Sequence, residues 1–163
     1  MFAREIFFCV TVVAMTGCVS IQGGNHIADE VTHSFSAAVE EKNGEKFKSL
    51  FLNENIDWFA VVSAQDMAGI YKNDQNQNKV NNHQVIPFAE WLSKTEESTQ
   101  VKFTNCRTSG DGDVMATACK YAFYLDGKKT NYGRESFILI NTGAGWKISS
   151  IAFSSTVADK NVP

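Results

Sequence analysis

Cys106 and Cys119 flank a predicted β-hairpin, which makes a disulfide the first chemistry to consider. If the turn of the hairpin centres on Gly112-Asp113, the two cysteines lie directly opposite each other, within reach of a cross-strand bond. If it centres on Asp111-Gly112, they are offset by two residues and the bond is harder to form. The alternative is two separately buried thiols. No Cys-x-x-Cys pair is present, so the sequence does not indicate thiol redox catalysis.

Another cysteine, Cys18, ends an N-terminal segment of a different kind. The apolar run from Ile6 to Val13 is shorter than the roughly 20 residues that a spanning helix takes, but it has the length of a signal-peptide core. Ala14-Met15-Thr16-Gly17-Cys18 follows it and resembles the bacterial lipobox. This resemblance implies that residues 1–17 are a lipoprotein signal peptide and that Cys18 carries acyl chains such as palmitate. The alternatives are an ordinary secretory signal or a buried N-terminal helix.

Lipidation of Cys18 would anchor the chain to a membrane, with residues 18–25 forming the lipidated cysteine and a tether. The residue after Cys18 is Val19, whereas an Asp there would favour retention at the inner membrane. We therefore expect a lipoprotein of the bacterial cell envelope, anchored in the outer membrane and facing the periplasm. An oxidising periplasm would also favour the bond between Cys106 and Cys119.

Length and charge exclude some classes of protein. The chain has 163 residues and a formal charge of −3, which removal of residues 1–17 leaves unchanged. A mildly acidic domain lacks the electrostatic footprint of a nucleic-acid binder. The length beyond the tether, residues 26–158, suits one domain with its own core.

The histidines and glycines give no strong site. His26, Glu30 and His33 share one helical face at a spacing that could hold a metal, but this face lies opposite the apolar stripe and is expected to be solvated. There is no Gly-x-Ser-x-Gly elbow, P-loop or Gly-x-Gly-x-x-Gly motif before a helix. The sequence therefore predicts neither a metal site nor a cofactor.

Hydrophobic periodicity predicts helices followed by a strand meander, which is an α+β order. Asn43-Gly44 is predicted to end the first helix, and Ser63 to Asp66 resembles a capping box. The polar residues 73–84 are predicted to be a surface loop, with a lid over a pocket as the alternative. The predicted helices lie at 27–42, 47–51, after Ser63 and from Pro87, and the predicted strands at 55–62, 101–108, 114–125, 130–141 and 145–156.

Four short stretches of the meander form a recognisable pattern: Tyr121 to Tyr124 (YAFY), the Asp126-Gly127 turn, Tyr132 to Phe137 (YGRESF) and Gly145 to Ile148 (GWKI). Together they resemble the nuclear transport factor 2-like superfamily, which includes the SnoaL-like cyclases and the ketosteroid isomerases. The resemblance implies a cone-shaped fold, in which N-terminal helices pack in a curved antiparallel sheet around an apolar cavity. It also implies a possible homodimer through the sheet. This fold hosts many unrelated activities.

The resemblance allows the isomerases' catalytic positions to be checked. Their tyrosine acid falls near Phe35 and their aspartate base near Phe59, and neither phenylalanine can transfer a proton. Asp57 lies on the same strand face as Phe59 and is the carboxylate expected to approach the cavity, where desolvation would suit it to act as a base. The alternative is a capping or sheet-edge carboxylate. Asp57 is therefore only a weak catalytic candidate.

Large aromatic residues with polar atoms could line such a cavity and orient a ligand, although most large aromatics belong to a plain core. The sequence favours a non-catalytic domain that binds a small apolar or amphipathic ligand or a protein partner. One alternative is a small isomerase, cyclase or dehydratase that uses Asp57, and another is a structural component of an envelope assembly. The ligand-pocket candidates are Asp57, Trp58, Tyr71, Trp91, Tyr121 and Tyr132.

Overall fold

The computed structural model describes residues 22–73 and 78–158, with the side chains of residues 26–68 and 78–158, and Cys18 lies outside this part. It confirms the α+β class, with helices preceding a long meander. The elements are the helices α1 (Gln22–Glu40), α2 (Gly44–Ser49), α3 (Ala64–Asn73) and α4 (Val85–Lys94), and the strands β1 (Asp57–Val62), β2 (Val80–Asn82), β3 (Thr99–Gly110), β4 (Val114–Leu125), β5 (Lys128–Asn141) and β6 (Trp146–Val157).

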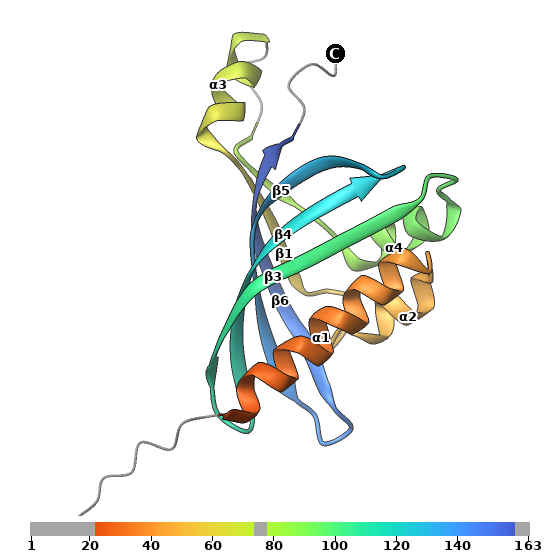
Figure 1. Cartoon of the computed structure of the whole chain (residues 1–163), viewed down its shortest axis with the longest axis vertical. Helices are drawn as coiled ribbons and strands as arrows, with labels where there is room; N and C mark the ends of the chain where they lie inside the picture. Colours follow the sequence, from red (N-terminus) through yellow and green to blue (C-terminus); the bar gives the residue numbers. More distant parts are fainter. Residues whose placement is uncertain (1–21, 74–77, 159–163) are drawn as a thin grey trace, which may run out of the picture.

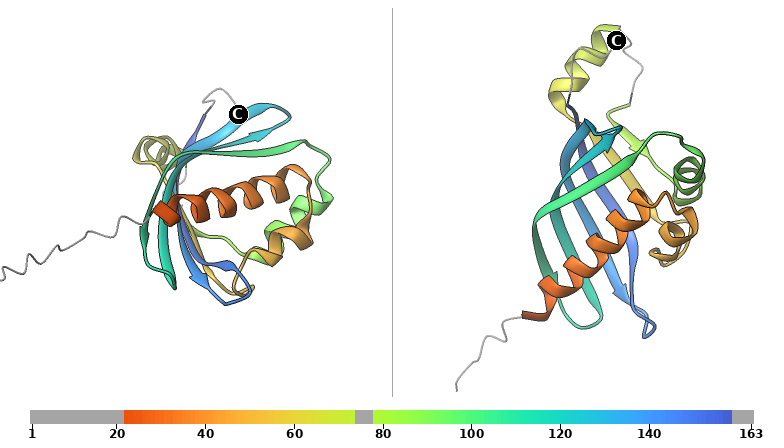
Figure 2. Two further views of the ribbon diagram at one scale, coloured as in Figure 1. Left: turned by 60° about the horizontal axis from the view of Figure 1, so that its bottom comes forward. Right: turned by 45° about the vertical axis from the view of Figure 1, so that its right-hand side comes forward.

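The strands form one sheet in the order β2-β1-β6-β5-β4-β3. Strands β3 to β6 pair antiparallel in sequence, whereas β1 pairs parallel with β6 and antiparallel with β2. The sheet curves around α1, which crosses its concave face, and α2 and α4 lie together beside α1 (Figure 1, Figure 2). No helix within the described ranges is long and apolar enough to cross a bilayer.

Helix α1 is longer at its N-terminus than the sequence predicts. It begins at Gln22 instead of Ile27, so the predicted start of the helix is wrong, and residues 22–25, which were assigned to the tether, are helical. Extending an existing helix costs far less than nucleating one, which allows polar, Gly-containing residues to continue it. Helix α1 ends at Glu40, close to its predicted end, but Asn43-Gly44 is not what ends it: Lys42 has the left-handed φ of 52°, and the backbone N–H of Asn43 donates to the carbonyl of Ala38. Asn43 and Gly44 instead begin α2, where the Asn43 side chain is the N-cap and accepts a hydrogen bond from the backbone N–H of Lys46.

The meander strands are confirmed, and each begins and ends within about two residues of its predicted bounds. Turn chemistry explains this agreement. Asp126 and Gly127 have φ angles of 47° and 73°, the left-handed conformations that a tight hairpin turn demands. Because such short turns fix the register of the strands they join, alternate residues of each strand face the same side of the sheet.

The β3–β4 hairpin has the first of the two registers considered above. Gly110 pairs with Met115, so the turn centres on Gly112-Asp113. The pairing is interrupted by a β-bulge that includes Cys106. The structure joins Cys106 to Cys119 of β4 by a disulfide, with the two Cα atoms 4.1 Å apart.

The segment between β1 and α4 differs from its prediction. Residues 73–84 include the strand β2, whose three residues are all exposed. A short edge strand needs no apolar face, so its polar composition gave no strand signal. The N-cap half of the capping box is confirmed: Ser63 Oγ accepts from the backbone N–H of Asp66 at 3.1 Å and donates to Asp66 Oδ2 at 2.8 Å. The backbone N–H of Ser63 donates instead to the carbonyl of Ser155 at 2.8 Å.

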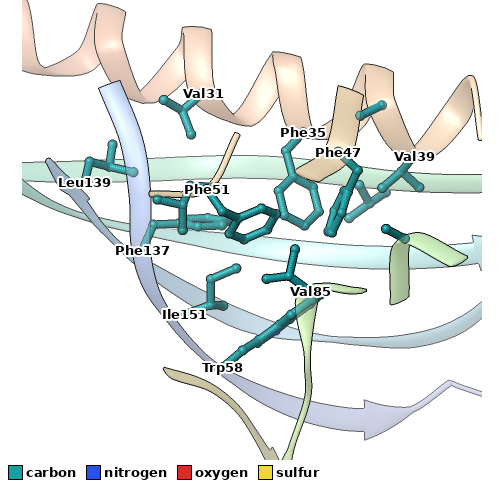
Figure 3. Close-up of a cluster of buried hydrophobic side chains, with 14 of the residues drawn as sticks. Val31, Phe35, Val39, Phe47, Phe51, Trp58, Val85, Phe137, Leu139 and Ile151 are labelled. Atoms are coloured by element: carbon teal, nitrogen blue, oxygen red, sulfur yellow. The ribbon is translucent and has the colours of Figure 1, made fainter. Parts of the chain in front are cut away.

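The core lies between α1 and the concave face of the sheet. Phe35 of α1 makes edge-to-face contacts with Phe47, Phe103 and Phe137, with ring centroids 5.0, 5.6 and 5.9 Å away. Figure 3 shows Phe35 and Phe47 close together beneath α1, with Phe137 nearby. The buried members of the core among the described residues lie between Val31 and Ile151, so we expect residues 22–163 to fold without the segment that precedes them.

Candidate ligand-binding cavity

A hollow of about 200 Å³ lies where α1, α4 and the concave face of the sheet meet. Its wall is mostly apolar, but a carboxyl, an imidazole, a phenol and an amide also reach it. This combination of an apolar wall with a few polar groups is typical of small-molecule sites. We call it the aromatic cavity, and its lining residues are Phe35, Trp58, His83, Phe88, Val101, Tyr121, Phe123, Asn131, Glu135 and Phe153.

The central polar residue of the cavity is Glu135, in the middle of β5. Glu135, Phe137 and Leu139 alternate along the strand, and all three are buried on its concave side. Glu135 pairs with Cys119 on β4 and with Phe153 on β6, so strands flank it on both sides. The geometry of the sheet therefore places a carboxyl group inside the molecule, with an exposed fraction of only 5%.

The Glu135 carboxyl makes no hydrogen bond and no ion pair with any described residue. Burial disfavours the charged form of such a group and raises the pKa of Glu135 to about 8. At neutral pH the carboxyl in the empty cavity therefore keeps its proton. It can donate a hydrogen bond to a bound molecule, or lose the proton when a positive charge approaches.

Tyr121 lies beside Glu135 and belongs to a polar network at the cavity wall. Its hydroxyl donates to the backbone carbonyl of Ser154 at 3.0 Å and accepts from Nδ2 of Asn131 at 3.1 Å. Burial raises the pKa of Tyr121 to about 12, with a further contribution from the charge of Glu135. The phenol is therefore neutral at physiological pH and held in a fixed position.

Trp58 and His83 supply further polar atoms. Trp58 is buried, and its indole Nε1 has no hydrogen-bond partner among the described residues. His83 follows β2 and packs between Trp58 and Phe153, with ring centroids 5.5 and 5.4 Å away. Burial lowers the pKa of His83 from its ordinary value, so the imidazole is neutral at physiological pH.

Asp57, the predicted carboxylate of the site, does not line the aromatic cavity. It is exposed on β1, whereas its neighbour Trp58 points inward. Phe59 is exposed as well, with 37% of its surface accessible. The expectation that Asp57 approaches the cavity is therefore wrong. The prediction of a strand was right, but the prediction of which side chains face the interior was inverted. A six-residue strand with aromatic residues at adjacent positions gives no clear alternation of apolar and polar side chains.

Only some of the other predicted pocket residues line the aromatic cavity. Trp58 and Tyr121 line the aromatic cavity. Trp91 does not: it is 37% exposed and packs against Phe88 and Phe123, which do line it. Tyr132 is 44% exposed, with the Lys129 ammonium 5.6 Å from its ring centroid. The side chain of Tyr71 lies outside the described residues.

Glu135, His83 and Asn131 were missed by the sequence reasoning. For Glu135 a signal was present, because Phe137 and Leu139 follow it at the spacing of one strand face. Phe35, near which the resemblance would place the isomerases' tyrosine, lies in the cavity wall. His26, Glu30 and His33 are all exposed, and no three potential metal ligands gather anywhere in the described ranges.

Comparison with known proteins supports the fold. Residues 28–158 match the SnoaL-like domain family, and no curated protein sequence matches the chain. The chain is structurally similar to the β subunit of a proposed aromatic-ring-hydroxylating dioxygenase from Novosphingobium aromaticivorans, with 11% identity and a TM-score of 0.61. The alignment covers 82% of this chain and 90% of that one.

Two further structures show the same similarity. A proposed dehydratase of the nuclear transport factor 2-like family from Streptomyces avermitilis has 18% identity and a TM-score of 0.58, with 82% of this chain and 96% of that chain covered. A protein of the same family and unknown function from Shewanella baltica has 12% identity and a TM-score of 0.54, with 87% and 100% covered. Identities this low show the fold alone. Because the family match spans most of its length, this chain belongs to the SnoaL-like domain family and has the nuclear transport factor 2-like fold.

Proposed function

We propose that this domain is a lipid-anchored periplasmic protein that binds a small, largely apolar ligand in the aromatic cavity without transforming it. The observation that carries the proposal is Glu135, a buried carboxyl without a partner in the described residues, within a mostly apolar wall. Buried polar groups are normally satisfied, and a void left by imperfect packing is lined by apolar groups. A polar group kept unsatisfied beside a cavity favours a ligand that satisfies it.

The size of the cavity limits the ligand. An engineered cavity of about 150 Å³ accommodates benzene, and the aromatic cavity measures about 200 Å³. A molecule with one ring and a few substituents therefore fits. The aromatic rings would contribute apolar contact, and Glu135, His83 and Trp58 offer polar atoms that fix the ligand's orientation.

A non-catalytic role is supported by Phe35. It lies in the cavity wall at the position where the ketosteroid isomerases keep their tyrosine acid, and its ring cannot donate a proton. The corresponding aspartate position, Phe59, lies on the outer face of the sheet. The proton-transfer pair of those enzymes is therefore missing at both positions.

A second candidate function is acid–base catalysis on the bound molecule, of the isomerase, cyclase or dehydratase kind. The observation that favours it is again Glu135, because a carboxyl with a pKa of about 8 can both give and accept a proton near neutral pH. The Glu135→Gln variant separates the two functions. Under the enzyme hypothesis it abolishes turnover, whereas a pure binding protein has no turnover to lose.

Anchoring at Cys18 and a location at the outer membrane, facing the periplasm, belong to the same proposal. The lipobox supports them, and the bond between Cys106 and Cys119 is consistent with an oxidising compartment. In a bacterial host, labelled palmitate is expected to enter the full chain but not its Cys18→Ser variant. Fractionation of the two membranes then tests the location, and release of the unsubstituted chain into the soluble fraction would contradict it.

A homodimer through the outer face of the sheet is a further part of the proposal. Phe59, Ala152, Ser136 and Ala118 pair in a row across β1, β6, β5 and β4 on this face. These side chains are small or apolar, which suits a flat contact between two sheets. The same face would serve an envelope assembly. Native mass spectrometry should show a dimer that Phe59→Asp dissociates, and a monomeric unsubstituted chain would contradict it.

The binding function is tested with tert-butylbenzene, a neutral one-ring probe, and residues 22–163 exported to the periplasm. Saturation-transfer NMR should detect binding to this chain. Val101→Phe adds a ring at the cavity wall and should weaken binding at least about tenfold. Val114→Phe makes the same change at a residue that is 49% exposed, away from the cavity, and should leave binding unchanged. Equal binding by all three chains would show that the probe does not occupy the cavity.

A further inference from the structure

The interior of this domain contains a carboxyl group, that of Glu135, to which the described residues bring no positive charge. Glu135 is 95% removed from solvent yet forms no ion pair within the described residues. An ionised carboxylate in such a place is strongly disfavoured unless a positive charge or hydrogen-bond donors accompany it. Whatever stabilises the ionised form of Glu135 must therefore come from outside the described part of the chain.

None of the elements packed against Glu135 presents a cation to it. On β4 its neighbours are Cys119, which is in the disulfide, and Tyr121, which is neutral. On β6 its neighbour is Phe153, and α1 contributes Phe35 to the cavity.

The cavity's remaining titratable group is His83, from the segment after β2. Burial lowers its pKa, so it is uncharged at neutral pH, and it forms no salt bridge with Glu135. Across the described residues, the cavity wall thus contains one acid and no base that is charged at physiological pH.

The walls around this acid are rich in aromatic rings. Trp58 lies between Phe88 and His83, with ring centroids 5.3 and 5.5 Å away, and Tyr121 meets Phe153 edge to face at 5.7 Å. The face of an aromatic ring carries negative electrostatic potential and attracts ammonium groups within about 6 Å of its centroid. Aromatic rings arranged around a carboxylate form a site suited to an organic cation.

We propose that the ligand of the aromatic cavity is an organic ammonium ion with an apolar substituent, bound with its positive charge beside Glu135. This rests on the binding function proposed above and specifies its ligand class. The ammonium supplies the counter-charge that Glu135 lacks, and the rings contact its alkyl groups. A neutral ligand could use the aromatic walls and accept a hydrogen bond from the protonated carboxyl, but it would form no ion pair with Glu135.

Binding of a cation should release a proton. In the empty cavity the carboxyl of Glu135 is protonated, and in the complex it is a carboxylate paired with the ammonium, so one proton passes to solvent. The pKa of Glu135 in the folded chain without a ligand is about 8. The affinity for a permanent cation should therefore rise by up to about tenfold per pH unit as the pH approaches 8, and it should level off above pH 8. A neutral ligand that accepts a hydrogen bond from the protonated carboxyl should show the opposite trend.

The test compares phenyltrimethylammonium with tert-butylbenzene, which has the same shape with carbon in place of the charged nitrogen. Both are titrated by NMR into residues 22–163 between pH 6 and 9. We expect the cation to bind at least about tenfold more tightly than the neutral probe at pH 9, and only the cation to gain affinity as the pH rises.

Two variants isolate the carboxyl. Glu135→Gln keeps the size of the side chain and should abolish both the preference for the cation and its pH dependence, while tert-butylbenzene binds as before. Glu97→Gln makes the same change at an exposed position and should alter neither. If Glu135→Gln does not fold, the pH profile of the unsubstituted chain decides.

Equal or tighter binding of the neutral probe, or affinity for the cation that does not rise with pH, would overturn the ligand class and leave the binding function standing. If neither probe binds, both proposals fail.

Discussion

Two adjoining regions of the interior are equally buried but differ in their polar groups: one region is apolar, and the other contains polar groups without hydrogen-bond partners in the described chain. Around Phe47, Phe137 and Leu139 the interior is closed and apolar, with exposed fractions of 0%, 1% and 0%. Around Glu135 and Trp58, exposed to 5% and 4%, it is hollow and holds a carboxyl and an indole N–H without partners in the described chain. Burial alone therefore does not distinguish the two regions. What distinguishes them is whether the buried polar groups are satisfied.

The border between the two regions crosses a single strand. Glu135 and Phe137 are successive inward positions of β5, yet one lines the cavity and the other packs against Phe35 with ring centroids 5.9 Å apart. A buried unsatisfied group typically costs 1–3 kcal/mol. We infer that the Phe137 side of this border is organised for stability and the Glu135 side for a ligand.

The largest expected effect comes from emptying the closed region. Phe137→Ala removes a ring that is 1% exposed and should lower the free energy of unfolding by about 3–5 kcal/mol. Phe153→Ala is the matched variant, at a partly buried residue of the cavity wall. It should lower the free energy of unfolding by about half as much, because the neighbouring side chains already border the cavity. Urea denaturation of residues 22–163 measures both. Equal losses would mean that the two regions are packed alike.

The disulfide should have the next largest effect. Cys106 and Cys119 close a loop with a sequence separation of 13, for which chain entropy predicts about 3 kcal/mol. A Cys106→Ala, Cys119→Ala double variant should therefore lower the free energy of unfolding by about that amount, and a reducing agent should destabilise the unsubstituted chain but not the variant. In the double variant, the rate of amide hydrogen exchange should rise first in the part of β3 between Cys106 and Gly110. Uniform acceleration that includes α1 would show that the bond also supports the closed region.

Glu135 should make stability depend on pH. Its pKa is about 8 in the folded chain against an ordinary value of 4.5. Between these values the folded state holds a proton that the unfolded state has lost, so the stability that is fully present below pH 4.5 declines as the pH rises towards 8. Between pH 6 and 7.5 the loss should be about 2 kcal/mol. Urea denaturation of Glu135→Gln at both pH values should show no such loss, and parallel pH profiles for the two chains would contradict the raised pKa.

The fold was predictable from sequence because local signals agreed with one another. The Asp126-Gly127 turn and the alternation along β5 each pointed to the same meander, and the first helix ends within two residues of its predicted end. Such signals act over a few residues, which is the range that sequence patterns report. The strand β2 was not predicted, because an exposed edge strand carries no apolar pattern in the sequence.

The site was less predictable, since it depends on contacts between residues far apart in the chain. Asp57 was favoured for its proximity to Phe59, but pairing with β6 turns both outward and Trp58 inward. His83 enters the cavity from a polar segment that was predicted to be a surface loop, with a lid over a pocket as the alternative. Glu135 could have been found, since its strand face was already readable from Phe137 and Leu139. A charged residue at an inward strand position is therefore a useful signal of a site.

The smallest expected effect concerns the hydroxyl of Tyr121, a polar group of the cavity wall that both donates and accepts a hydrogen bond within the protein. It donates to the Ser154 carbonyl at 3.0 Å and accepts from Asn131 at 3.1 Å. Tyr121→Phe removes both bonds and should lower the free energy of unfolding by about 1 kcal/mol. Tyr132→Phe, at a residue that is 44% exposed, should change it by less than about 0.5 kcal/mol.

This pair of tyrosine variants also tests the division between the two regions. If Tyr121 belongs to the scaffold of the cavity, Tyr121→Phe loses stability while the probe affinities and the pH dependence set by Glu135 stay unchanged. Loss of probe binding at unchanged stability would instead move Tyr121 into the ligand-contacting set. The boundary between stabilising and ligand-binding groups would then lie between Tyr121 and Phe137, two aromatic side chains of neighbouring strands.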